Sequence, residues 1–160
     1  ESSAIFEYLE ELYPEPALLP DKILDKFEAR KLMYWFDDTF HTEVTSKLLY
    51  QRVYNKLSGS KYTDSGIMKS GMKALTAHFN YIDDLLEQRR WLAGDKMTIA
   101  DLTGAAHISS LDYLGDVDWG RFDSIKSWYV KIKSRPAFRA LLKDYLPTFL
   151  PPNHYSDLDF

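Results

Sequence analysis

The 160-residue sequence contains no cysteine. This absence excludes disulfide bonds, cysteine-ligated zinc, iron–sulfur clusters and a cysteine nucleophile from the chain. No apolar run approaches the roughly 18 residues that a membrane-spanning helix requires, and no signal peptide opens the chain. The net charge is -4, from 20 basic and 24 acidic residues, whereas nucleic-acid binders normally carry an excess of basic residues on one face. We therefore expect a cytoplasmic protein that neither binds nucleic acid nor inserts into a membrane.

The apolar residues recur at helical spacing along nearly the whole chain, without strand-like alternation or an Asn-Gly or Asp-Gly hairpin turn. The pattern predicts an all-α bundle of about five to six helices. The expected helices cover residues 2–13, 21–57, 67–88, 98–111 and 121–134, with a short sixth helix that begins at Pro136.

The second expected helix would be roughly 55 Å long if it were straight. We expect it to bend near residues 42–45, a β-branched stretch of low helix propensity. Three prolines in the last part of the chain predict an irregular tail over residues 145–160.

The sharpest local motif lies in the sequence Gly-Asp-Lys-Met-Thr-Ile-Ala-Asp at residues 94–101. Thr98 and Asp101 have the spacing of a capping box, in which each side chain bonds the backbone amide of the other residue. A catalytic carboxylate at Asp101 is the alternative interpretation. We favour the structural one, because a buried helix start must satisfy its free amides.

No motif of the chain indicates a metal or nucleophilic site. The histidines have no metal-ligand spacing, and His107 is expected to be a hydrogen-bonded core residue. Nucleophile-elbow and phosphate-loop motifs are absent. The four histidines are His41, His78, His107 and His154.

Taken together, several motifs resemble the glutathione S-transferase superfamily. Residues 1–11 resemble the end of its thioredoxin-like domain, 91–101 its C-terminal folding motif, and 134–138 the usual end of its helical domain. The resemblance implies three parts. Residues 1–20 would be the last helix of a thioredoxin-like domain with its linker, 21–144 the C-terminal helical domain, and 145–160 a tail.

The resemblance also implies where glutathione chemistry would lie. The residue that activates the glutathione sulfur belongs to the thioredoxin-like domain in this family, so we expect no catalytic residue in this chain and no metal. Of the glutathione site, only Glu1 and Ser2 correspond to family positions, if glutathione binds. A helix N-terminus suits a carboxylate, but Ser2 fits a simple N-cap equally well. The family is typically homodimeric, so we expect a homodimer.

Further segments resemble a group of glutathione-transferase-like division proteins of alphaproteobacteria, which bind the tubulin-like protein FtsZ. The matching segments are residues 41–44, 48–49, 110–119 and 154–160. The resemblance implies a scaffold in which the tail binds FtsZ. The expected partner-binding residues are Tyr155, Asp157, Leu158, Asp159 and Phe160.

Two interpretations remain open at this point. The tail either forms an exposed recognition strip, in which buried aromatic anchors supply binding energy, or it folds back onto the domain. The complete protein is either the FtsZ-binding scaffold or a transferase that conjugates glutathione to small apolar electrophiles. In the second case the N-terminal half of the long helix, including Tyr34, would line the substrate pocket.

Overall fold

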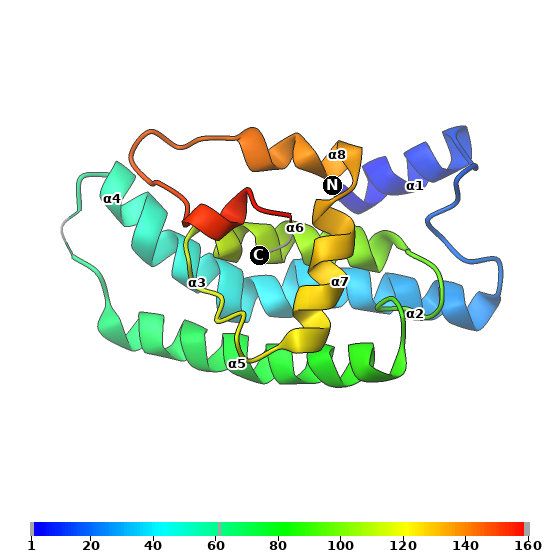
Figure 1. Ribbon diagram of the computed structural model, residues 1–160, viewed down its shortest axis with the longest axis horizontal. Helices are drawn as coiled ribbons and strands as arrows, with labels where there is room; N and C mark the ends of the chain where they lie inside the picture. The colour runs from blue at the N-terminus through cyan, green and yellow to red at the C-terminus, as the bar shows by residue number, and fades with distance from the viewer. Residues whose placement is uncertain (1, 61, 159–160) are drawn as a thin grey trace.

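A computed structural model describes residues 2–60 and 62–158 of the chain (Figure 1). The described residues form helices and turns, with no β-strand beyond two isolated bridges, Trp91 with Gly94 and Leu146 with Phe149. The helices are α1 (Ser2–Leu12), α2 (Ile23–Tyr34), α3 (Ser46–Leu49), α4 (Asn55–Leu57), α5 (Ser65–Gln88), α6 (Ile99–Tyr113), α7 (Asp123–Lys133) and α8 (Pro136–Arg139). The expected all-α fold is confirmed.

The segments α2, α3 and α4 belong to one long helix. Two π-helical stretches, Trp35–Thr45 and Tyr50–Tyr54, join them without a break, because the residue at each junction keeps right-handed helical dihedral angles. The hydrogen-bond pattern changes at Thr45, where the first π-helical stretch ends. The bend expected near residues 42–45 stays a prediction. Helix α5 packs along the long helix (Figure 1).

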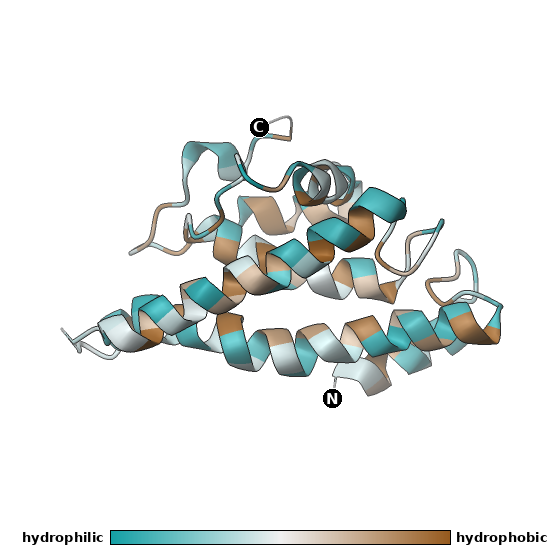
Figure 2. Ribbon diagram, turned by 90° about the horizontal axis from the view of Figure 1, so that it is seen from below, coloured by the Kyte–Doolittle hydropathy of each residue, from teal (hydrophilic) through white to brown (hydrophobic). Residues whose placement is uncertain are grey.

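The core lies between the long helix, α5, α6 and α7. Apolar residues recur in bands along these helices (Figure 2), and their inward members form one buried cluster. Gly104 of α6 allows the closest approach, because a Cβ atom there would lie 2.7 Å from the Phe36 ring. The long-helix members of the cluster are Ala29, Leu32, Met33, Phe36, Phe40, Val44 and Leu48.

Helix α1 packs against the start of the long helix and is fixed there by polar contacts. The Arg30 guanidinium donates two hydrogen bonds of 2.9 Å to the Glu7 carboxylate. The Glu10 carboxylate accepts the amides of Leu18 and Leu19 at 2.8 Å, which holds the linker against α1. Large apolar residues are exposed on α1, just after it and at the start of α2, namely Ile5, Tyr8, Leu9, Leu12, Tyr13, Ile23, Leu24 and Phe27.

Short 3-10 turns at Leu141–Lys143 and Asn153–Tyr155 interrupt the C-terminal part of the chain, which otherwise lacks regular structure. Pro136 stands at the first turn of α8, as expected. Over the described residues, no helix is both long and apolar enough to cross a membrane.

Candidate functional site: the C-terminal tail and its buried anchors

The Thr98–Asp101 motif is a structural cap. The capping box is formed, and Asp101 is fully buried. Its carboxylate accepts the Leu92 amide at 2.9 Å, the Thr98 amide at 2.7 Å, the Thr98 hydroxyl at 3.1 Å and the Trp128 indole N–H at 2.8 Å. These bonds join the loop before α6, the start of α6 and α7, and they leave the carboxylate no route to a substrate.

The tail crosses α6 and is anchored there by Tyr155 (Figure 1). This side chain is 4% exposed. Its hydroxyl lies 3.0 Å from the Ser109 hydroxyl, and its ring meets the Tyr113 ring edge-on with the centroids 5.1 Å apart. The expectation that Tyr155 is an exposed recognition anchor is therefore wrong, because apolar burial and a buried hydrogen bond hold it inside the domain.

Beside Tyr155, a buried carboxylate on α6 binds the tail a second time. Asp112 accepts a hydrogen bond of 2.9 Å from the His154 ring, and because a carboxylate only accepts, the His154 Nε2 atom carries the proton. The same Asp112 oxygen accepts the Trp119 indole N–H at 2.9 Å. Asp112 thus connects the tail to the loop that follows α6.

Lys133 completes this network from α7. Its ammonium lies 3.9 Å from the second Asp112 oxygen, with both side chains fully buried, and it donates to the His154 carbonyl at 3.2 Å. Burial lowers the pKa of Lys133, while the Asp112 charge opposes that shift. The Lys133 ammonium and the Asp112 carboxylate therefore hold His154 against α7 and α6.

The remaining tail residues lie beyond these anchors. Asp157 is exposed and Leu158 is half-buried, while Asp159 and Phe160 lie outside the described residues. Asp157 and Leu158 thus place an acidic and an aliphatic side chain just after the turn that is bonded to α6. Their role in binding a partner stays a prediction.

The expected glutathione residues lie at the opposite terminus. Glu1 is outside the described residues, and Ser2 is the exposed first residue of α1. Tyr34 is half exposed and borders a shallow hollow of about 570 Å³ that Phe27 and Arg30 also line. The described residues contain no group of acidic and histidine side chains that could hold a metal ion.

Two further histidines, His107 and His78, bond to neighbouring side chains. The Nδ1 atom of His107 shares a hydrogen bond of 3.1 Å with the Thr45 hydroxyl. Its Nε2 atom lies 3.4 Å from the Asp37 carboxylate. Burial lowers the pKa of His107. His78 bonds the Glu43 carboxylate at 2.7 Å. These contacts confirm His107 as a hydrogen-bonded residue at the edge of the core.

A second buried carboxylate, Asp116, lies just after α6. It pairs with Arg52 of the long helix, but neither of its oxygens accepts a hydrogen bond from a described residue. Burial raises the pKa of Asp116 from 3.8 to about 6, although the Arg52 charge opposes this shift.

The raised pKa of Asp116 has a measurable consequence. The folded chain holds this proton more tightly than the unfolded chain does, so the free energy of unfolding contributed by Asp116 falls as pH rises from about 4 to about 6. The expected slope is roughly 1.4 kcal/mol per pH unit over that window. Urea unfolding of wild type and Asp116→Asn at several pH values measures it. Parallel pH profiles for the two proteins would contradict it.

The sequence analysis did not predict the Asp112–Lys133–His154 network. Lys133 follows the inward residues Tyr129 and Ile132 of α7, and the four-residue spacing from Tyr129 places it on the same inward stripe. The helical spacing therefore indicated that Lys133 is buried. No local pattern signalled its partner, because Asp112 and His154 are 42 residues apart.

The comparisons with known proteins agree on the family. Residues 53–145 match the family described as "Glutathione S-transferase, C-terminal domain". The chain is 44% identical to FtsZ-localized protein A of Caulobacter vibrioides, over 100% of this chain and 70% of that protein. It is 27% identical to glutathione S-transferase F14 of Arabidopsis thaliana, over 99% of this chain and 61% of that protein.

Solved structures give the same picture. FzlA from C. crescentus superposes with a TM-score of 0.96 at 44% identity, over 99% of this chain and 70% of that one. A glutathione S-transferase from Rhodospirillum rubrum F11 reaches a TM-score of 0.95 at 44% identity, over 100% and 72% of the two chains. On the evidence of the helical fold, the capping box and these matches, the chain belongs to the glutathione S-transferase family and contains its C-terminal domain.

Proposed function

We propose that the protein is a cell-division scaffold that binds FtsZ filaments with the end of its C-terminal tail. The observation that carries the proposal is the 44% identity to FtsZ-localized protein A over the whole of this chain, tail included. Fold alone does not decide function. The R. rubrum glutathione S-transferase matches the whole chain at the same 44% identity, so the preference for the scaffold rests on the printed role of the curated relative and not on the degree of identity.

The geometry of the tail supports the proposal. Tyr155 and His154 are hydrogen-bonded to α6, so Asp157 and Leu158 follow directly after a fixed point of the chain. Binding segments that are held in place lose less conformational entropy when a partner docks. The exposed acid Asp157 next to Leu158 would meet a basic and apolar surface on FtsZ.

Charge reversal of Asp157 tests the tail directly. We expect Asp157→Lys to reduce co-sedimentation with FtsZ filaments at least fivefold and to flatten its salt dependence, because an acid at the rim of an interface mainly speeds association. Asp95→Lys is the matched control, since Asp95 is an exposed acid in the loop before α6. Equal loss in both variants would show a general charge effect and contradict the assignment to the tail.

The scaffold is proposed to act as a homodimer. Several large apolar residues of α1 and α2, among them Ile5, Ile23 and Phe27, are more than 60% exposed. Exposed apolar side chains that gather into a patch mark contacts with other protein surfaces. Light scattering of the complete protein measures the oligomeric state, and a monomer at every concentration would contradict the dimer.

A glutathione transferase is the second candidate, favoured by the 44% identical structure from R. rubrum, which is described as a glutathione S-transferase. The hollow beside Tyr34 would then form one wall of a pocket for an apolar electrophile. Residues 1–160 alone should not conjugate glutathione to a nitroaromatic electrophile above background, since we propose no catalytic residue in this chain. Measurable conjugation would contradict that and place a catalytic group within these residues.

A further inference from the structure

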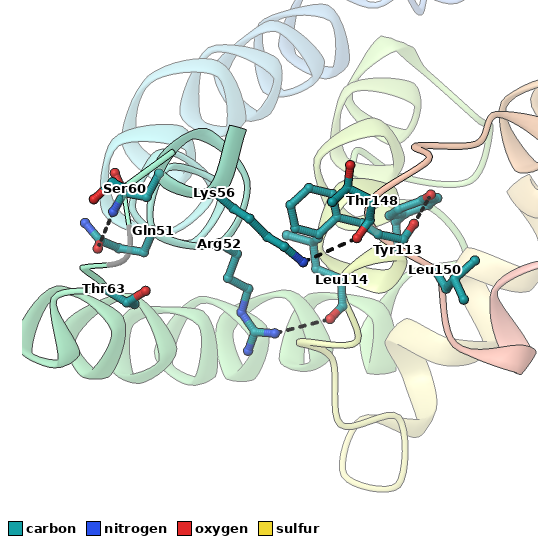
Figure 3. Close-up of a pocket in the computed structure, with 11 residues that line it drawn as sticks. Gln51, Arg52, Lys56, Ser60, Thr63, Tyr113, Leu114, Thr148 and Leu150 are labelled. Atoms are coloured by element: carbon teal, nitrogen blue, oxygen red, sulfur yellow. Dashed lines mark hydrogen bonds between the residues drawn. The ribbon is translucent and has the colours of Figure 1, made fainter. Parts of the chain in front are cut away.

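A groove opens at the end of the bundle far from α1. It has a volume of about 690 Å³ and lies between the C-terminal end of the long helix, the end of α6 and the tail segment 148–150 (Figure 3). Arg52 and Lys56 reach into it from the long helix, and Phe149 and Leu150 line it from the tail segment. Neither the capping box nor the Asp112 network belongs to this groove.

The groove is lined by positive charge, although the chain as a whole is negatively charged. The protein carries a net charge of -4, yet among its described lining residues two are cations and none is a carboxylate. Arg52 is partly neutralised by Asp116, which contacts it from outside the groove. Lys56 makes no ion pair with any carboxylate in the described part of the chain.

Each cation makes a weak hydrogen bond to a neutral carbonyl, which for Arg52 comes in addition to its ion pair with Asp116. Arg52 donates to the Leu114 carbonyl at 3.4 Å, and Lys56 donates to the Thr148 carbonyl at 3.4 Å (Figure 3). The Lys56 ammonium also lies 4.6 Å from the centroid of the Phe149 ring. A carboxylate bears a full negative charge, so it attracts a cation more strongly than a neutral carbonyl does. A carboxylate that entered the groove would therefore displace these carbonyl contacts.

The placement of the cations indicates the shape of such a ligand. Arg52 lies in the second π-helical stretch and Lys56 in α4, and both side chains line the groove from the long helix. In an extended peptide, side chains two residues apart point to the same side. Two carboxylates in an acid–x–acid pattern can therefore both face the long helix. The middle side chain points away from it and is available to cover the lining residue Leu150, which is 77% exposed.

We propose that this groove binds an extended acidic segment of a partner protein, with an acid–apolar–acid pattern. Its two carboxylates bind Arg52 and Lys56, and its apolar residue covers Leu150. A chain segment fits better than a small anion because Lys56, Thr148 and Leu150 are exposed, whereas small-molecule sites bury roughly 70–90% of their ligand. This proposal does not depend on FtsZ binding.

Fluorescence anisotropy tests the proposal with a labelled hexapeptide of alternating Glu and Leu with blocked ends. We expect saturable binding to the chain that Lys56→Gln weakens about tenfold, the loss that corresponds to one charge-assisted hydrogen bond. Lys69→Gln is the matched control, because Lys69 is an exposed lysine of α5 outside the groove, and it should bind as wild type does. Equal binding by wild type and Lys56→Gln would overturn the proposal.

Two further arms identify the ligand. The same peptide with Gln in place of Glu should not bind, and citrate at equal ionic strength should not displace the acidic peptide. Binding of the Gln peptide would overturn the need for carboxylates, and displacement by citrate would show a small-anion site instead of a peptide groove. Leu150→Ser should weaken binding while leaving the melting temperature unchanged, and no effect would overturn the apolar contact.

A last arm addresses the tail of the chain itself, which has the acid–apolar–acid sequence at residues 157–159. Deleting residues 157–160 should leave the affinity for the peptide unchanged. Tighter binding after the deletion would show that the tail occupies the groove, which would overturn its assignment to a partner protein.

Discussion

Asp101→Ala is expected to lower the free energy of unfolding by about 3–5 kcal/mol, because four buried donors lose their acceptor at about 1–3 kcal/mol each and local relaxation recovers part of that cost. The donors are the amides of Leu92 and Thr98, the Thr98 hydroxyl and the indole N–H of Trp128. Burial also raises the pKa of Asp101, so removing the carboxylate relieves a desolvation cost and offsets part of the loss. Chemical denaturation measures the change, and the melting temperature should fall by roughly 10 °C.

Two variants show whether the loss comes from the buried bonds of Asp101. Trp128→Phe removes one of the donors and should cost less than Asp101→Ala. Asp95→Ala removes an exposed acid of the same loop and should change stability by less than about 0.5 kcal/mol. If Asp101→Ala were no more destabilising than Asp95→Ala, the carboxylate would not hold the loop, α6 and α7 together.

The helical fold was predictable because the patterns that specify it lie within short stretches of the sequence. The inward residues of α5, Leu75, Phe79 and Ile82, follow the helical repeat, and the capping box needs only residues three positions apart. The π-helical stretches were not predictable, since Trp35–Thr45 contains no proline or glycine. An extended hydrogen-bond register in such a stretch depends on how the helix packs against its neighbours, which local propensity does not encode.

The candidate site was predictable only in part, because its contacts are between residues far apart in the sequence. The groove brings Arg52 together with Leu114, 62 positions later, and Lys56 with Thr148, 92 positions later. The tail was read as an exposed strip from its alternation of apolar and acidic residues. That reading failed at Tyr155, whose burial depends on Ser109 and Tyr113 of α6, and no pattern within the tail encodes those contacts.

Two deletions at the C-terminus are expected to separate the folding role of the tail from its binding role. Deleting residues 155–160 removes the buried Tyr155 ring and its bond to Ser109, and the loss of a large buried aromatic side chain costs about 3–5 kcal/mol. Deleting residues 157–160 keeps Tyr155 and the His154–Asp112 bond, so the free energy of unfolding should fall by less than about 1 kcal/mol.

Under the proposed function, both deletions abolish co-sedimentation with FtsZ, but only the longer one lowers the melting temperature strongly. The shorter deletion is therefore the decisive variant. If it kept full FtsZ binding, the residues beyond Tyr155 would not be the contact, and the scaffold proposal would lose its site. If it melted as early as the longer deletion, residues 157–160 would stabilise the fold themselves, and loss of FtsZ binding would follow from unfolding and not from a missing contact.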